Sequence, residues 1–403
     1  MPTLASLLRM TLSVGLAVSP SPTPFDAGFN ISAVATLAMA LPSHSWEYGT
    51  AAQALLELLT PAYSVFGPSP FPVPALVMGD VPALAYAAQK ITLGGNGLSD
   101  GHGSVGDPAS LGIAAVMLGK SDARFAAGAK RQIQYLLEEA PRWPNGAISQ
   151  RADIAELWAD FMYMAPPFIA YFAADTNNAS LLQLAYQQCG LQREVLLIGS
   201  NASTPSPIGS SQTNGRWHHI VGPQSADAGL WSTGNGWAAM GMARVLATVL
   251  TAPVARASKW QARAAADLTA WIKEIVDGAR SSPLDRGLLR NYLDDKSGAG
   301  GFGEIAGSAL HAATAYRMAV LAPETFPANK YVAWADSVRR ALGGRNAAGR
   351  PHVAANGTVT PAVNPLAWKD TAPWTAGSPE GNNFVVLMYA AWRDCIHAGV
   401  CKK

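Results

Sequence analysis

Residues 121–141 have the sequence SDARFAAGAKRQIQYLLEEAP, which contains every local signal of an amphipathic helix. Ser121-Asp122 provides a side chain that can cap the helix N-terminus, and Pro141 ends the pattern. The apolar residues recur at the helical period and fall on one face: Phe125, Ala129, Ile133, Leu136 and Leu137. The stretch therefore predicts a helix that runs to Ala140 and packs one face against a core.

The same pattern recurs along most of the chain, with almost no alternating strand pattern between the helices. Two long examples are Asp153–Ala173, where Pro166-Pro167 should kink or restart the helix, and Pro253–Asp277. The other predicted helices are 31–40, 50–59, 82–90, 109–119, 179–191, 235–250, 307–320, 329–342 and 382–396. Loops rich in Gly, Pro and Ser separate them and no linker divides the chain, so we expect an all-α fold in which residues 1–403 form one domain.

Paired helices of this kind can stack as a solenoid or close into a ring of inner and outer helices. No residue signature recurs at a fixed period, which disfavours a consensus repeat array. The loops are rich in Trp, His, Asp and Gly, and such loops suit a closed α/α barrel that carries a site at its open end.

The composition excludes several classes of protein. The 29 basic and 27 acidic residues leave a net charge of +2 without long runs of one sign, so we expect no binding to nucleic acid or to an anionic membrane. The hydrophobic fraction of 49% against 14% charged residues is typical of a globular chain with a large core. Past the N-terminus, no apolar stretch approaches the length of a membrane span.

Several features bear on the cellular compartment. Leu4–Val18 is apolar except for Arg9 and fits a signal peptide or a first helix equally well. Four glycosylation sequons favour a secreted protein: Asn30, Asn178, Asn201 and Asn356. Of the three cysteines, Cys395 and Cys401 are close enough in sequence to bridge, but three free thiols fit as well. No cluster of Cys and His has metal-site spacing, so we expect no metal and no cofactor.

Asp160 is the first candidate for chemistry, within the stretch 158–168, WADFMYMAPPF. A carboxylate inside an apolar helical run needs polar partners or takes a raised pKa, which is what a general acid at neutral pH requires. The alternative is an Asp160 that points to solvent on the polar side of its helix.

A second candidate is the glycine-rich stretch 97–108, GLSDGHGSVGDP, which carries Asp100, His102 and Asp107. Asp107 can cap a helix that begins at Pro108. A loop carboxylate that faces Asp160 would also give the paired carboxylates of glycoside chemistry.

A third group of residues combines indole rings with amides, imidazoles and hydroxyls. It comprises Trp217 and His219, the block 230–237, LWSTGNGW, with Trp231, Thr233, Asn235 and Trp237, and the stretch 44–49, HSWEYG, with Trp46 and Tyr48. Sugars stack on aromatic rings and bind amide and imidazole groups through their hydroxyls, so carbohydrate is the expected ligand. A single buried Trp is nonetheless more often part of a core than a sugar platform.

These motifs resemble the unsaturated rhamnogalacturonyl hydrolases of glycoside hydrolase family 105, which are relatives of the unsaturated glucuronyl hydrolases of family 88. The likeness runs from Trp46-Glu47-Tyr48-Gly49 through the Asp-x-x-Tyr-Met-x-x-Pro-Phe and Trp-x-x-Gly-Asn-Gly-Trp motifs to the stretch 303–309. It implies a six-hairpin (α/α)6 barrel that removes the 4,5-unsaturated uronic acid that polysaccharide lyases leave on oligosaccharides.

The resemblance also implies roles for single residues. Asp160 matches the general acid/base, Asp107 matches a second functional carboxylate with Asp100 as the alternative, and His219 matches an aromatic-x-His position. Trp231, Asn235 and Trp237 match the block that lines the site.

Two positions depart from the family pattern. Thr233 stands where many bacterial members have an arginine, and Ser149-Gln150-Arg151 stands where they have a histidine. Arg151 or Arg216 therefore binds the uronate carboxylate in place of that arginine, or the preferred sugar differs.

We expect a secreted glycoside hydrolase that hydrates unsaturated uronyl oligosaccharides, with pectic rhamnogalacturonan as their expected source, and needs no protein partner. One alternative is inversion at a saturated glycoside by Asp160 and Asp107. Another is a non-catalytic sugar-binding protein that keeps the tryptophans but not a functional Asp160.

Overall fold

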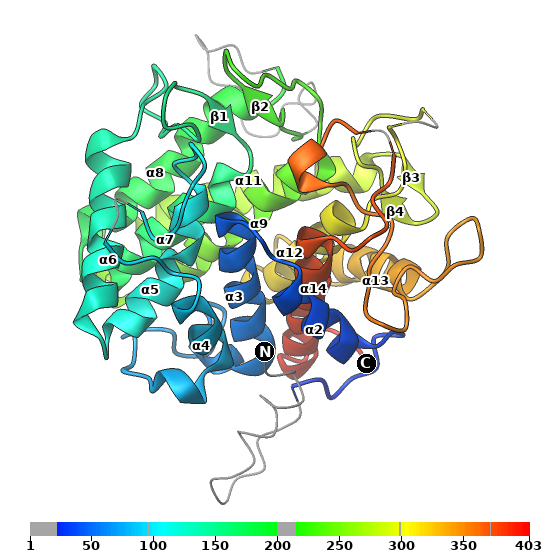
Figure 1. Ribbon diagram of the computed structural model, residues 1–403, viewed down its shortest axis with the longest axis horizontal. Coiled ribbons are helices and arrows are strands. Elements are labelled where there is room, and N and C mark those ends of the chain that lie inside the picture. The colour runs from blue at the N-terminus through cyan, green and yellow to red at the C-terminus, as the bar shows by residue number, and fades with distance from the viewer. Residues whose placement is uncertain (1–21, 95–96, 200–214, 298–299, 371) are drawn as a thin grey trace, which may run out of the picture.

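The computed structural model describes residues 22–94, 97–199, 215–297, 300–370 and 372–403, and this part of the chain is mostly helical (Figure 1). Outer and inner helices alternate along the chain in two concentric rings, and the last inner helix packs against the first. The ring is therefore closed. The fold is an (α/α)6 barrel, as predicted, and not a solenoid.

Each of the twelve ring helices overlaps a stretch that the sequence predicts to be helical. The inner ring consists of α3 (Ser45–Leu59), α5 (Gly112–Gly119), α7 (Phe161–Asp175), α9 (Ser232–Thr251), α12 (Ile305–Leu321) and α14 (Pro379–His397). The outer ring consists of α2 (Ile31–Ala40), α4 (Pro82–Ala88), α6 (Ala123–Gln134), α8 (Ala179–Leu196), α11 (Gln261–Ser281) and α13 (Tyr331–Leu342).

Shorter elements lie between the ring helices. Turns of 3-10 helix are η1 (Pro61–Tyr63), η2 (Met78–Asp80), η3 (Asp107–Leu111) and η5 (Pro365–Ala367), a π-helical turn η4 (Tyr135–Glu139) extends α6, and α10 (Pro253–Arg256) precedes α11. Two antiparallel pairs are formed by β1 (Leu157–Trp158) with β2 (Ile220–Val221) and by β3 (Leu284–Asp285) with β4 (Leu288–Leu289). In Figure 1 both pairs lie at the upper end of the barrel, and the C-terminus lies at the lower end.

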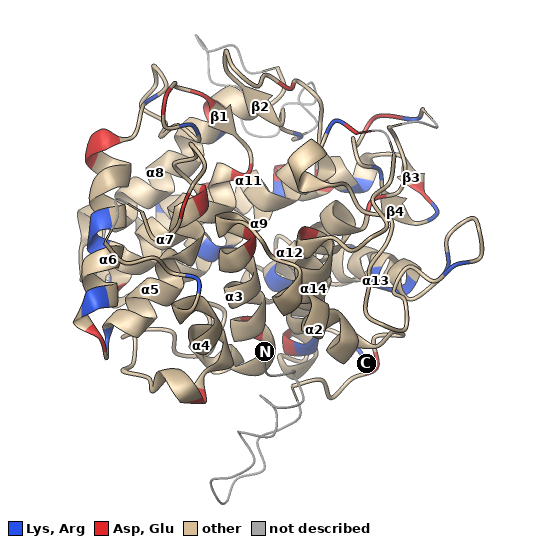
Figure 2. Ribbon diagram, in the orientation of Figure 1, with Lys and Arg blue, Asp and Glu red and all other residues tan. Residues whose placement is uncertain are grey.

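Sequence composition separates the two rings. The inner helix α9 buries every residue from 232 to 249, whereas the outer helix α6 buries only one face, with Phe125, Ala129 and Ile133. Figure 2 shows the consequence: most of the ribbon is uncharged, and basic residues lie along α6 at the edge of the molecule. A helix that is apolar on all sides is stable only where it is surrounded, which is the position of the inner ring.

The sequence predicted that the two prolines of α7 would kink the helix or make it restart, and the helix does not restart. Pro166 and Pro167 lie inside a continuous helix from Phe161 to Asp175. Pro166 has no N–H to offer the carbonyl of Met162 four residues earlier, and α9 approaches that carbonyl closely through Gly241. A Cβ on Gly241 would lie 2.0 Å from the Met162 oxygen, so this close approach requires glycine.

The predicted helix 153–173 begins later than expected, because its first residues form other structure. Leu157–Trp158 pairs with Ile220–Val221, and the Glu156 carboxylate accepts hydrogen bonds from the backbone N–H groups of Gln224 and Ser225. Asp160 therefore lies at the N-terminus of α7 and not inside a helical run. Its side chain makes no capping hydrogen bond, so the carboxylate is available for another role.

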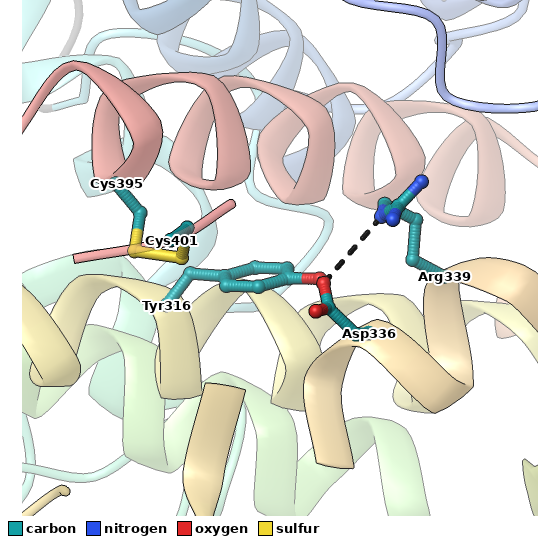
Figure 3. Close-up of a disulfide and its surroundings, with 5 residues drawn as sticks. All are labelled: Tyr316, Asp336, Arg339, Cys395 and Cys401. Carbon is teal, nitrogen blue, oxygen red and sulfur yellow. Dashed lines mark hydrogen bonds and ion pairs between the residues drawn. A yellow bond between two sulfur atoms is a disulfide. The ribbon is translucent and has the colours of Figure 1, made fainter. Parts of the chain in front are cut away.

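The C-terminal residues are joined by a disulfide between Cys395 and Cys401, which lies beside Tyr316 and the Asp336–Arg339 pair (Figure 3). Cys189 is a buried free thiol. Asn30, Asn178 and Asn356 are exposed. The fourth sequon, Asn201, and the ambiguous stretch 1–20 lie outside the described residues. Among the described helices, none combines the length and apolar character that a bilayer crossing requires.

The lower end of the barrel is held by a buried ionic network. Glu57 of α3 is fully buried, and its two oxygens accept hydrogen bonds from Arg244 of α9 and Arg317 of α12, each at 2.8 Å. Arg244 also donates to the Tyr163 hydroxyl of α7, and Arg317 donates to Asp394 of α14. One carboxylate thus links three inner helices directly and two more through its partners.

We expect Glu57→Gln to lower the free energy of unfolding by about 3–5 kcal/mol, because it leaves buried guanidinium charge uncompensated. Urea unfolding measures the change. The matched control is Arg263→Ala, which removes the ion pair between an exposed guanidinium and Asp267 and should lower the free energy of unfolding far less than Glu57→Gln does. Equal losses in the two variants would show that the Glu57 network does not hold the ring.

Candidate active site

A cavity of about 350 Å³ opens at the upper end of the barrel, where the inner helices begin. This volume lies at the lower end of the range for small-molecule sites, roughly 300–1,000 Å³. Its wall is rich in polar and aromatic side chains and includes Trp46, His102, Ser104, Asp107, Gln150, Arg151, Trp158, Asp160, His219, Trp231, Trp368 and Glu380. They come from the N-terminal ends of four inner helices, α3, α7, α9 and α14, from η3, and from the loops beside them.

The direction of the inner helices shapes the electrostatics of the cavity. The N-terminal end of a helix carries partial positive charge, which stabilises nearby carboxylates. Asp107, Asp160 and Glu380 all lie within the first turns of helical segments that point their N-termini at the cavity. The arrangement can therefore hold several acidic groups close together.

Asp160 is paired with a buried histidine. The Oδ2 atom of Asp160 lies 3.2 Å from Nε2 of His219, whose side chain is only 1% exposed. On the other side of the ring, Nδ1 of His219 lies 3.0 Å from Oδ2 of Asp227. Burial alone would lower the pKa of His219, but the two flanking carboxylates outweigh it and the pKa is raised.

Asp107 lies in the same cavity with different partners. Its Oδ1 accepts a hydrogen bond from the Gln150 amide at 2.7 Å, and that amide also donates to the Ser104 hydroxyl. Burial raises the pKa of Asp107 to about 7, Asp160 adds to the rise, and the hydrogen bonds and Arg151 oppose it. Asp107 is the first residue of η3 and makes no capping bond, so the predicted role as a helix cap is wrong.

Glu380 is a further buried acid on the wall, at the start of α14. Its Oε1 accepts a hydrogen bond from the Trp46 indole at 3.0 Å. Burial, together with the charge of Asp160, raises its pKa well above the usual range.

Four indole rings give the cavity its apolar surface. Trp46, Trp158, Trp231 and Trp368 line it, and three of them surround His219: the ring of Trp231 lies 4.4 Å away, that of Trp368 5.5 Å and that of Trp158 5.8 Å. Indole faces suit the C–H faces of sugars, and the acids and amides suit their hydroxyls.

The structure brings together seven of the residues selected from sequence: Trp46, His102, Asp107, Arg151, Asp160, His219 and Trp231 all line the cavity. Asp100 does not. Its side chain is 75% exposed and accepts a hydrogen bond from the His102 backbone, which resolves the choice of loop carboxylate at the wall in favour of Asp107. Tyr48 does not line the cavity either. Its hydroxyl donates a hydrogen bond to the Ser43 carbonyl, and the Lys90 ammonium lies over its ring.

Trp217, Thr233, Asn235 and Trp237 were expected in the site but are fully buried away from the cavity. The physical reason is that α9 begins at Ser232, before the predicted start at 235, and buries every residue from 232 to 249, so residues 233–237 are enclosed by the neighbouring helices. Asn235 clamps the backbone of Trp217 through hydrogen bonds at 2.8 and 3.0 Å. Trp237 packs on Tyr163 and Phe384 in the core.

Thr233 has a structural role that the sequence did not suggest. Its hydroxyl donates to the buried Glu304 carboxylate at 3.3 Å, which joins the N-terminus of α9 to that of α12. Thr233 therefore stabilises the junction of two inner helices and does not line the cavity.

Sequence reasoning missed five residues: Gln150, Trp158, Asp227, Trp368 and Glu380. Ser378-Pro379-Glu380 has the signature of a helix start, so Glu380 could have been found once the inner helices were known to begin at the cavity. Trp158 lies only two residues before Asp160 in the sequence, but it was not predicted to be a site residue. Trp368 and Asp227 reach the site on long loops, for which the sequence carries no local signal. Across the described ranges, no group of acidic, His or Cys residues could hold a metal ion.

A family model described as Glycosyl Hydrolase Family 88 matches residues 112–341, which is more than half of the chain. The chain belongs to Glycosyl Hydrolase Family 88. Its matched segment contains Asp160, His219, Asp227 and Trp231 but not Glu380. Comparison with curated protein sequences gives no match.

Solved structures share the fold of this family 88 protein at low sequence identity. A structure from Salmonella enterica, described as a possible member of family 105, is 12% identical, covers 98% of this chain and 99% of its own, and has a TM-score of 0.66. The unsaturated glucuronyl hydrolase of Bacillus sp. GL1 is 14% identical, with coverage of 91% and 96% and a TM-score of 0.59. An α-1,6-mannanase from Salegentibacter sp. is 12% identical, with coverage of 92% and 100% and a TM-score of 0.58.

Because of Asp107, we expect the free energy of unfolding of the wild type to decrease as the pH rises from about 4 to about 7. The pKa of this group is about 7 in the folded protein and 3.8 as its reference value, so the unfolded chain binds fewer protons over this range. Asp107→Asn should remove that part of the slope. Urea unfolding at several pH values measures it, with the exposed Asp153→Asn as control. Parallel pH slopes in wild type and Asp107→Asn would contradict the expectation.

Proposed function

We propose that this family 88 protein hydrates the C4=C5 double bond of an unsaturated uronic acid at the end of an oligosaccharide. The observation that carries the proposal is the Asp160 carboxyl on the cavity wall, free of capping bonds and 3.2 Å from a histidine with a raised pKa. Such a pair can supply a proton to a carbon atom and recover one from water.

The chemistry needs no nucleophilic side chain. Asp160 protonates C4 of the enol ether, and a water adds to the resulting cation at C5 as it loses a proton. The product is a hemiketal at C5 that opens the ring, and the hemiacetal left at C1 then releases the aglycone. Asp107, with Gln150 on its Oδ1, is placed to orient the water.

A negatively charged substrate needs a positive partner. Of the two arginines that can compensate for Thr233, Arg151 lines the cavity, and its Nε has only a long ion pair of 3.9 Å with the exposed Asp153. We assign the uronate carboxylate to Arg151. The Bacillus neighbour is an unsaturated glucuronyl hydrolase and the Salmonella neighbour a possible family 105 member, which supports an unsaturated uronide, with rhamnogalacturonan fragments as the first to test.

Inversion at a saturated glycoside is the second candidate function. Two carboxyl groups, Asp160 and Asp107, share one cavity, and a mannanase has the same fold. An inverting pair requires one protonated acid and one ionised base, and the pKa of Asp107 near 7 suits the acid. The match to family 88 and the unsaturated glucuronyl hydrolase neighbour support an unsaturated substrate instead. Hydration is therefore the preferred proposal.

We also propose that the protein is secreted. The exposed positions of Asn30, Asn178 and Asn356 suit glycosylation, and the Cys395–Cys401 disulfide suits an oxidising compartment. Mass spectrometry of the protein from its native source tests this by detecting glycan on these sites.

Asp160→Asn should lower turnover of unsaturated uronyl disaccharides by at least about 10³-fold, because amide nitrogen cannot deliver the proton. The assay follows loss of absorbance of the double bond, on disaccharides made by lyases from rhamnogalacturonan and from glucuronan. Asp80→Asn, at an exposed aspartate of η2 that is not on the cavity wall, is the control and should retain activity.

The same assay separates the competing functions. Cleavage of saturated aryl glycosides without loss of double-bond absorbance would favour the inverting hydrolase. Sugar binding without turnover of either substrate class would favour a binding protein.

A further inference from the structure

A chain of three polar side chains, Tyr292, Asp227 and His219, lies behind Asp160. The proposed hydration assigns no role to Tyr292 or Asp227. Tyr292, Asp227 and His219 come from separate segments: His219 precedes β2, Asp227 follows it and Tyr292 follows β4. The Tyr292 hydroxyl donates to Oδ2 of Asp227 at 2.7 Å, and that same oxygen lies 3.0 Å from Nδ1 of His219. The chain ends at Asp160, 3.2 Å from Nε2.

The backbone holds the chain in place. The N–H of His219 donates to the Gly229 carbonyl, and its own carbonyl accepts from Ala159, the residue before Asp160, both at 2.9 Å. A Cβ on Gly229 would lie 2.3 Å from the Tyr292 ring, so glycine is needed for this packing. The positions of the imidazole and of Asp160 are thus fixed by the same local structure.

The contacts determine where the protons lie. Oδ1 of Asp227 accepts from the Gly229 N–H, and Oδ2 accepts from Tyr292, so the carboxylate has only acceptor sites to offer. Burial would raise the pKa of Asp227, but the bonds from His219 and Tyr292 outweigh it and the pKa lies well below the usual range. Nδ1 of His219 therefore carries a hydrogen toward Asp227, and Nε2 faces Asp160.

Charged groups reach His219 from two sides only within the described chain. Asp160 lies at Nε2 and Asp227 at Nδ1, while the rings of Trp158, Trp231 and Trp368 pack around the imidazole. Beyond these, Asp107 and Glu380 interact electrostatically with Asp160, and Tyr292 interacts with Asp227 and Asp160. Nε2 of His219 and Oδ2 of Asp160 can therefore share one proton between them.

We propose that Asp227 and Tyr292 are positioning residues that hold His219 as the proton reserve of Asp160. The proposal rests on the proposed hydration. One proton passes from Nε2 of His219 to Asp160 and from Asp160 to C4, which leaves His219 neutral and Asp160 ionised. The water that forms the C–O bond at C5 loses one proton, which returns to the Asp160–His219 pair, so the proton count is restored after each turnover.

The test compares Asp227→Asn and Tyr292→Phe with a matched control elsewhere in the protein. Tyr186 donates to Asp267 at 2.6 Å in the same kind of pair, between α8 and α11 of the outer ring, so Tyr186→Phe removes an equivalent bond far from the cavity. For each variant, kcat and KM on the unsaturated disaccharide are measured across pH. The titration of His219 is followed by NMR of its imidazole nitrogens.

Asp227→Asn should lower kcat about tenfold or more with KM within about threefold, because it removes proton positioning and not substrate binding. The pKa of His219 should fall, since an opposing charge is lost, and the alkaline limb of kcat should move to lower pH with it. Tyr292→Phe should shift both in the same direction by less. Tyr186→Phe should change neither.

An unchanged kcat profile in Asp227→Asn or Tyr292→Phe, at preserved melting temperature, would overturn the proposal, as would a His219 titration that does not respond. If Asp227→Asn does not fold, Tyr292→Phe, which keeps the charge, decides. The NMR titration needs no substrate. If the wild type does not turn over unsaturated sugars, hydration fails, while the titration still shows whether Asp227 keeps the proton on His219.

Discussion

The buried Glu57 carboxylate between Arg244 and Arg317 is the constraint on which the barrel depends, because it ties inner helices that are far apart in sequence. At the same end Arg393 donates to the carbonyls of Glu57 and Leu58, which end α3. The guanidinium groups lie where the C-terminal ends of the inner helices concentrate negative partial charge. Closure of the ring and compensation of the helix dipoles are therefore achieved by the same side chains.

The opposite end of the ring has the opposite polarity, and the site follows from it. The N-terminal ends of the inner helices accommodate Asp107, Asp160 and Glu380 close together, which would otherwise repel one another. The partners of these acids differ: Gln150 donates to Asp107, the Trp46 indole donates to Glu380, and His219 faces Asp160. One fold feature, the common direction of six helices, thus makes a multi-acid cavity possible.

The sequence was sufficient to predict the helices and Asp160, the first residue of the site. It was insufficient to predict the residues whose positions depend on long-range packing. The period of apolar residues located α6 and α9, and the apolar surroundings of Asp160 marked it as a candidate. Nothing local indicated that Ser232 would start α9, so Thr233, Asn235 and Trp237 were expected in the cavity and lie in the core. Asp227 and Trp368 were missed because loop closure brings them to His219, and sequence spacing carries no trace of it.

The buried network at the far end has a consequence for how a polymer can be handled. Beneath the cavity the barrel is filled by Tyr163, Trp237 and Arg244, and Glu57 closes the axis below them. The cavity is consequently blind-ended, and no polysaccharide strand can thread through it. A ligand that enters the cavity must therefore leave through the mouth by which it entered.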